Sequence, residues 1–104
     1  MTDVARHAPD PGTARSPHWP AVEHAHLSRQ PCCQACGGKH DLNVHHVRPF
    51  HLYPERELDD DNLITLCRFC HLVFGHFHDW KSFNVQVVSD AHDYHRRLLR
   101  RPAA

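Results

Sequence analysis

The cysteines of this chain fall into two pairs with the spacing of zinc ligands. Two residues separate the members of each pair, and thirty residues lie between the pairs. Structural zinc takes four such ligands in a tetrahedron, usually from two short turns that the fold brings together. Free buried thiols and two disulfides are the alternatives, and we favour zinc because no secretory leader is expected. The predicted ligands of a structural Zn²⁺ ion are Cys33, Cys36, Cys67 and Cys70.

A finger with two cysteines and two histidines is excluded by the same spacing. It would use Cys33, Cys36, His71 and His76, but that fold allows only about 12 residues between its cysteine and histidine pairs. Cys32 is left over, because it has no partner at a distance of two intervening residues.

A double histidine and an asparagine accompany the cysteines. His45 and His46 are adjacent, Asn62 precedes an apolar run, and His71 directly follows Cys70. Imidazole titrates near neutral pH and binds divalent cations. Because zinc at Cys70 would fix the direction of the next side chain, we expect these residues to meet in one cleft. Other histidines are expected at the surface, among them His7, His18, His24, His26, His92 and His95.

The elements that must position these residues are short strands and helices, an α+β arrangement. Apolar and β-branched residues predict strands over 42–47 and 63–66. A first helix is expected to begin at Ser16, with the following proline in its first turn. A second helix begins at about Arg68, and Ser89 is the expected cap of the last one.

The helical wheel of the second helix predicts which of its faces is buried. Its apolar residues share one arc, whereas His71 falls on the opposite side. The expected core face consists of Phe69, Leu72, Val73, Phe77 and Trp80.

The order and spacing of these motifs resemble the HNH endonuclease family, in its small phage- and bacterium-encoded, zinc-containing type. The resemblance covers about residues 33–76. It implies a ββα-metal (His-Me finger) core with a four-cysteine structural zinc site and flanking N- and C-terminal helices. The motifs that carry it are Cys33-x-x-Cys36-Gly37, Val44-His45-His46-Val47-Arg48-Pro49-Phe50, and Asp61 through Cys67-x-x-Cys70-His71.

The resemblance also implies a role for each polar residue. His46 would be the general base that activates water, and Asn62 would hold the His46 loop by hydrogen bonding. His45 and His71 would bind a catalytic divalent metal, Mg²⁺, Mn²⁺ or a similar ion. His76 lies one residue later than the family pattern would place a third ligand, so it is either a ligand or phosphate contact or a packed histidine.

Size and charge limit the remaining expectations. The chain has 104 residues and no net charge, but residues from 63 onward hold six basic and three acidic side chains. We expect a disordered tail over 1–15, one nuclease domain over 16–100 and a short tail over 101–104. No apolar run is long enough to cross a membrane. Candidate nucleic-acid contacts are Arg68, Lys81, Arg96, Arg97 and Arg100.

The resulting functional expectation is cleavage of double-stranded DNA. We expect weak sequence specificity, because no base-reading module is visible. The alternative is a non-catalytic zinc module on the same fold that binds nucleic acid or a protein. Reduced thiols suggest the cytoplasm of a bacterial or phage-infected cell, and a phage or a mobile element as the source.

Overall fold

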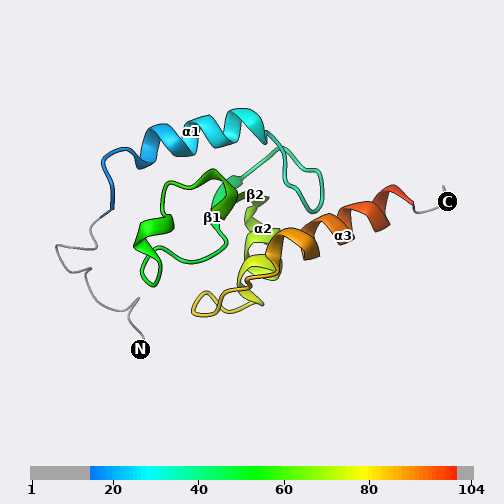
Figure 1. Ribbon diagram of the computed structural model, residues 1–104. Helices are drawn as coiled ribbons and strands as arrows, with labels where there is room; N and C mark the ends of the chain where they lie inside the picture. Colours follow the sequence, from blue (N-terminus) through cyan, green and yellow to red (C-terminus); the bar gives the residue numbers. More distant parts are fainter. Residues whose placement is uncertain (1–14, 101–104) are drawn as a thin grey trace.

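The computed structural model describes residues 15–100 of the chain. Its centre is an antiparallel hairpin of β1 (Leu42–His46) and β2 (Leu63–Cys67), which leads directly into α2 (Arg68–Cys70) and the π-helical η5 (His71–Gly75). Figure 1 shows α1 (Trp19–Arg29) crossing one side of the hairpin and α3 (Val87–Leu99) extending away from the body. The chain is therefore a small α+β structure.

The pairing register of the hairpin decides which histidine faces which way. His45 pairs with Ile64, and His46 pairs with Leu63. Because neighbouring side chains of a strand point to opposite faces, His45 and His46 lie on opposite sides of the sheet. The connection between the strands contains two short 3₁₀ turns, η3 (Pro54–Arg56) and η4 (Asp60–Asn62).

The first helix starts later than expected and protects one edge of β2. Ser16 lies before the helix, where its Oγ accepts a hydrogen bond from His18 N, and the proline in the first turn is Pro20. At the other end, the Gln30 side chain accepts a hydrogen bond from Thr65 N at 3.0 Å. Gln30, the residue after α1, thus pairs with a backbone N–H group that the outer edge of β2 would otherwise leave exposed.

The expectation that His26 lies at the surface is wrong. This side chain is 2% exposed, with Nδ1 at 2.8 Å from Asp60 Oδ1 and Nε2 at 2.9 Å from Gln30 Oε1. It joins α1 to η4 and, through Gln30, to β2. The partners come from distant parts of the chain, so the local polarity around His26 gave no sign of burial.

The predicted core face of the second helix is also wrong. Phe69, Phe77 and Trp80 are 69%, 57% and 48% exposed. The wheel assumed an unbroken α-helix, but three α-helical residues are followed by a π turn that ends at Gly75. The core instead joins the sheet, the cysteine turns and α3, and its buried members are Cys33, Ala35, Ile64, Leu66, Cys70, Val87 and Ala91.

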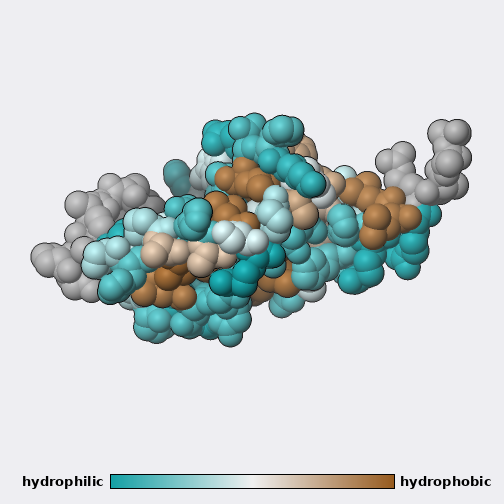
Figure 2. All heavy atoms as spheres, turned by 90° about the horizontal axis from the view of Figure 1, so that it is seen from above, coloured by the Kyte–Doolittle hydropathy of each residue, from teal (hydrophilic) through white to brown (hydrophobic). Residues whose placement is uncertain are grey.

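The last helix begins at Val87, two residues before its expected cap. Ser89 lies inside the first turn, and its Oγ donates to Gln86 O. Val87 and Ala91 are fully buried, so only the first half of α3 packs into the core. The second half projects from the body (Figure 1), and in Figure 2 apolar residues form separate patches on a mostly hydrophilic face.

Within the described residues, no helix combines the length and apolar character needed to cross a bilayer. The expected tails over 1–14 and 101–104 lie outside the described residues. Arg15, which we had assigned to the first tail, forms defined contacts that are described below.

Candidate active site

The two cysteine pairs meet between the turn before β1 and the start of α2. Their four Sγ atoms lie within 4.8 Å of one another, and 3.8 Å separates Cys36 Sγ from Cys67 Sγ. Four ligands at a Zn–S distance of about 2.3 Å would be about 3.8 Å apart at tetrahedral angles. The cluster formed by Cys33, Cys36, Cys67 and Cys70, which we call the thiolate cluster, therefore fits a structural zinc ion.

Backbone N–H groups support negative charge in the thiolate cluster. Cys36 N donates to Cys33 Sγ at 3.4 Å, and Cys70 N donates to Cys67 Sγ at 3.5 Å. Burial raises the pKa of Cys33, but backbone hydrogen bonds outweigh it and bring this pKa to about 7. Burial raises the pKa of Cys36 and Cys70. A bound cation is what would keep all four sulfurs deprotonated.

A second group of metal-binding side chains, the histidine cluster, consists of His45, His71 and His76. Their candidate ligand atoms also lie within 4.8 Å of one another. The Nε2 atoms of His71 and His76 are 3.2 Å apart. Two nitrogens bound at about 2.1 Å to one cation would be about 3.0–3.4 Å apart. The spacing of the histidine cluster therefore fits a shared divalent ion.

Neighbouring oxygen atoms fix the tautomers of two of these imidazoles. His71 Nδ1 lies 3.2 Å from Asn43 Oδ1, and His76 Nδ1 lies 2.6 Å from Ser82 O. Because both oxygens accept, each Nδ1 carries a hydrogen and each Nε2 presents a lone pair to the other. His45 Nε2 is buried without a hydrogen-bond partner. A cation bound between these nitrogens would stabilise their inward-facing lone pairs.

The π turn brings His71 and His76 together although they are five positions apart in the sequence. In an α-helix of 3.6 residues per turn, such residues would point about 140° apart. The wider i→i+5 turn places them on the same side. The sequence left His76 as either a ligand or a packed side chain. It lies in the histidine cluster, and its role as a ligand stays a prediction.

Gly75 allows the His45 ring to approach η5. A Cβ atom at this position would lie 2.9 Å from His45 Cε1 and 3.1 Å from His45 Nε2. Such distances are shorter than real contacts, so any side chain here would displace the imidazole. Gly75, which interrupts the expected helix, therefore leaves the space that the His45 ring occupies.

Burial keeps His45 and His71 neutral. It lowers the pKa of His45 to about 3, with further lowering by the positive charges that His71 and His76 would carry. Burial and the neighbouring His76 lower the pKa of His71 to about 4. Neutral imidazole is the form that binds metal, so both side chains are in the ligand form at pH 7.

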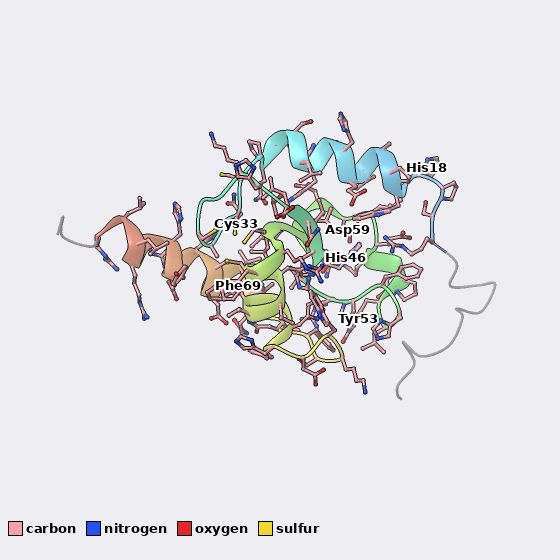
Figure 3. All side chains as sticks on the ribbon, turned by 180° about the vertical axis from the view of Figure 1, so that it is seen from behind. His18, Cys33, His46, Tyr53, Asp59 and Phe69 are labelled. Carbon is pink, nitrogen blue, oxygen red and sulfur yellow. The ribbon has the colours of Figure 1, made fainter. Side chains whose placement is uncertain are left out.

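His46 lies on the other side of the hairpin and has a free ring nitrogen. Its Nε2 is 2.9 Å from Glu57 O, so Nε2 carries the hydrogen and Nδ1 keeps its lone pair. The Trp19 ring packs on it at a centroid distance of 4.7 Å. Burial lowers the pKa of His46 below its usual value, although the bond to Glu57 opposes this. In Figure 3, His46 lies toward Tyr53 and Cys33 lies toward α3.

A cleft of about 520 Å³ connects the two sides of the site. Its lining includes His46 and His71, together with Arg68 and Trp80. His45 and Asn62 are not among the lining residues, so the expected meeting of all four polar residues in one cleft is only partly realised. His45 is 4% exposed and lies in the histidine cluster behind the cleft.

Asn62 ties together the two ends of the connection between the strands. Its Oδ1 accepts from Arg48 N at 2.9 Å, and its Nδ2 donates to Arg48 O and to Arg56 O, both at 3.1 Å. Asn62 itself is 1% exposed. These bonds hold the segment that follows His46 and the segment that leads to Glu57 O.

Known proteins match the part of the chain that contains both clusters. Residues 33–75 match the family model described as HNH endonuclease. This segment, which we call the HNH segment, is similar to that family. The HNH segment is consistent with the ββα-metal fold, since its hairpin leads directly into a helical turn that carries ligands.

A curated relative is similar over a short stretch. The putative COX1/OXI3 intron 2 protein of Saccharomyces cerevisiae is 43% identical over 49 residues, which cover 38% of this chain and 6% of that protein. The chain thus spans a small fraction of that relative. No solved structure matches the chain significantly.

Sequence reasoning missed two residues beside the HNH segment's histidines. Glu57, which belongs to none of the motifs, is 4% exposed and accepts hydrogen bonds from Arg15 Nε at 2.6 Å and Ser16 N at 3.1 Å. Its main-chain oxygen is the one that contacts His46. Asn43 could have been found, because residues two apart on a strand share a face and Asn43 therefore lies beside His45.

The predicted nucleic-acid contacts come from three separate segments of the chain. Arg68 lines the cleft. Lys81 is exposed next to Trp80. Arg96, Arg97 and Arg100 belong to α3 and its C-terminal end, and Arg96 borders a separate cavity of about 210 Å³ beside the thiolate cluster.

Proposed function

We propose that the chain is a metal-dependent HNH endonuclease that hydrolyses DNA phosphodiester bonds. One observation carries the proposal: the inward Nε2 lone pairs of His71 and His76 lie beside a cleft that also exposes His46, whose Nδ1 is free to accept a proton. A cation site and a base on one cleft are the parts that hydrolysis of a phosphodiester needs.

The histidine cluster would hold the catalytic metal through His45, His71 and His76. The metal would supply positive charge to offset the charge that develops on the phosphate and the leaving oxygen. Asn43 and Ser82 O orient two of the ligand rings by accepting their Nδ1 hydrogens. Three imidazoles suit Ni²⁺ or Zn²⁺ better than Mg²⁺ or Mn²⁺, which prefer oxygen ligands.

His46 acts as the general base in this proposal. Glu57 O fixes the tautomer, so Nδ1 takes the proton of a water molecule that attacks phosphorus. The lowered pKa keeps this nitrogen unprotonated at neutral pH. A positioned base contributes about 10²–10⁴-fold to such a reaction. Asn62 holds the loop that carries Glu57 and so positions the base indirectly.

The thiolate cluster has a structural role in this proposal. A zinc ion there would join the turn of Cys33 and Cys36 to the start of α2 and would fix His71, the residue after Cys70. Arg68, Lys81 and the α3 arginines are the proposed contacts to the DNA backbone. Double-stranded DNA would be bound with weak sequence specificity, because such contacts read phosphates and not bases.

The cysteines of the thiolate cluster also bear on the cellular compartment of the proposed reaction. Thiolate ligands need a reducing compartment, which supports the cytoplasm of a bacterial or phage-infected cell. Similarity to a protein named for an intron supports a role in a mobile element.

Nicking of supercoiled plasmid by the purified chain with Mn²⁺ or Mg²⁺ tests the proposal. His46→Ala should abolish nicking while zinc content and folding persist. His24→Ala is the matched control, because His24 is exposed on α1, and it should nick like the wild type. If the wild type and His46→Ala are equally inert with every divalent metal, the chain is a binding module and not a nuclease.

A further inference from the structure

The cleft beside His46 has two indole walls. Trp19 comes from α1 and Trp80 from the turn after η5, so residues 61 positions apart in the sequence face one cavity of about 520 Å³. Concave sites of roughly 300–1,000 Å³ suit small ligands. A concave site of this kind does not match the convex surface of a regular duplex, but it suits one nucleotide that has left the stack.

Trp80 is held over the histidine cluster at a cost in backbone strain. Its ring centroid lies 5.0 Å from that of His71 and 4.8 Å from that of His76. The turn that returns the chain to this position has Phe77 and His78 at φ of 53° and 65°. Bulky residues rarely adopt this region, and such strain is concentrated at functional sites. Even so, Trp80 remains 48% exposed.

The two tryptophans have different roles in the cleft. Trp19 is covered by Arg15, whose guanidinium carbon lies 4.9 Å from the ring centroid, and by His46 at 4.7 Å. It is a fixed wall. Trp80 has the Arg68 guanidinium carbon at the longer distance of 5.9 Å. An exposed indole beside an exposed arginine is a platform on which a nucleobase can stack.

Glu23 distinguishes a base from a phosphate in this cleft. Its side chain belongs to the lining, where a carboxylate repels a phosphate but accepts hydrogen bonds from N–H groups. Each of the four bases has an N–H group on its Watson–Crick edge, and the partner strand occupies that edge in a duplex. The edge is free only when the base is unpaired.

We propose that the cleft binds an unpaired nucleobase next to the phosphate that is cut, stacked on Trp80 with its Watson–Crick edge toward Glu23. The proposal rests on the nuclease function and names its substrate class as a nucleic-acid strand that is locally unpaired at the cutting site. Bulged or gapped duplexes and single strands share this chemistry, and fully paired DNA lacks it.

Binding of labelled oligonucleotides tests the proposal independently of cleavage. Fluorescence anisotropy with the full zinc-loaded chain, in Ca²⁺ to limit turnover, compares a paired duplex, the same duplex with a one-nucleotide bulge, and the single strand as DNA and as RNA. We expect the bulged duplex to bind roughly tenfold tighter than the paired one, as stacking of one base allows. The DNA and RNA arms show which strand the cleft takes.

Two variants localise the effect. Trp80→Leu should remove most of the preference for the bulged duplex, and Glu23→Ala should remove part of it. Phe69→Leu is the matched control, because Phe69 is also an exposed aromatic residue but is not among the lining residues, and it should keep the full preference. Cobalt binding and the melting temperature check that Trp80→Leu remains folded and keeps the histidine cluster.

The outcomes separate this proposal from the nuclease proposal. Equal affinity for paired and bulged duplexes, or a preference that survives in Trp80→Leu, overturns the unpaired-base proposal even if plasmid nicking is observed. A bulge preference that depends on Trp80 supports it even if no substrate is cut, and in that case only the nuclease function fails. Cleavage that occurs mainly opposite or beside the bulge supports both.

Discussion

At the scale of single residues, the histidine cluster depends on groups outside its own three imidazoles. Asn43 accepts a hydrogen from His71, Ser82 O accepts one from His76, and Gly75 leaves room for His45. Each sets the direction of one imidazole, so each controls the convergence of three lone pairs. The roles are separable by substitution, because the three supports lie on different segments.

Gly75→Ala tests the close approach of His45 to η5. The added methyl group would lie 2.9 Å from the ring, so the imidazole must move out of the histidine cluster. We expect affinity for Mn²⁺ or Co²⁺ to fall about 10–100-fold, as for other disturbed supports of metal ligands. Titration with Co²⁺ measures this, and an unchanged zinc content in the thiolate cluster is the internal control. Wild-type affinity would show that the ring can bind elsewhere.

Asn43 offers a conservative test of tautomer control. Asn43→Ala removes the acceptor for His71 Nδ1 and should weaken metal binding about 10-fold or more, whereas Asn43→Asp keeps an acceptor and should retain binding. Isothermal titration with Mn²⁺ compares the two. Equal losses in both variants would mean that Asn43 acts through packing and does not orient His71.

At the scale of elements, the sequence predicted what short-range chemistry determines. Both strands, the cysteine turns and the helix after Cys67 lie where apolar pattern and ligand spacing placed them. The helical wheel failed at Phe69 and Trp80, because no residue type signals a π turn and the wheel fixes 100° per residue. The prediction for His26 failed for another reason. Tertiary packing determines its partners, which are Asp60 and, through Gln30, Thr65.

The same limit applies to the candidate site. Spacing could place Cys33, Cys36, Cys67 and Cys70 together, since two-residue gaps form a turn whatever the rest of the chain does. It could not show that His45 and His46 occupy different sides of the hairpin, with only His46 lining the cleft. It also could not connect Arg15 to Glu57, because that pair bridges 42 positions and neither residue belongs to a motif.

The attachment of α1 should depend on acid pH through Asp60. Hydrogen bonds from His26 and Arg29 hold the pKa of this carboxyl below its usual 3.8. A depressed folded-state pKa adds stability above pH 3.8 that is lost as pH falls through the folded value. The protection of α1 amides, which is their hydrogen exchange relative to the intrinsic rate at the same pH, should therefore fall in that acid range. In Asp60→Asn, exchange at pH 7 should already be faster, and unaltered exchange would show that α1 is held by other contacts.

At the scale of the whole molecule, the core is too small to explain a stable fold by itself. Eight apolar residues are buried in the described part of the chain, and two of them are cysteines of the thiolate cluster. Small domains of this kind commonly need a metal or a disulfide. The described cysteines form no disulfide, so zinc is the expected source of the missing stability.

Cys67→Ser should therefore unfold the domain. Removal of one ligand weakens zinc binding, and for a structural site the free energy of binding is part of the free energy of folding. Circular dichroism and melting curves at neutral pH measure the effect, and a strong zinc chelator should produce the same loss in the wild type. Cys32→Ser, at the cysteine outside the thiolate cluster, should fold normally. Normal melting of Cys67→Ser would refute the structural role of zinc.

Salt should weaken DNA binding by the intact chain. If Arg68, Lys81 and the α3 arginines neutralise several phosphates, the logarithm of affinity falls by about 0.9 per contact for each tenfold rise in salt. Replacement of Arg96, Arg97 and Arg100 by Gln should lower this slope if α3 contacts the duplex. An unchanged slope would restrict binding to the cleft.

The direct succession of Cys70 and His71 has a consequence for the cell that makes this protein. Until zinc binds, the imidazole after Cys70 has no fixed direction. On the proposed function, a newly synthesised copy would cut no DNA in its own cell before it had taken up zinc.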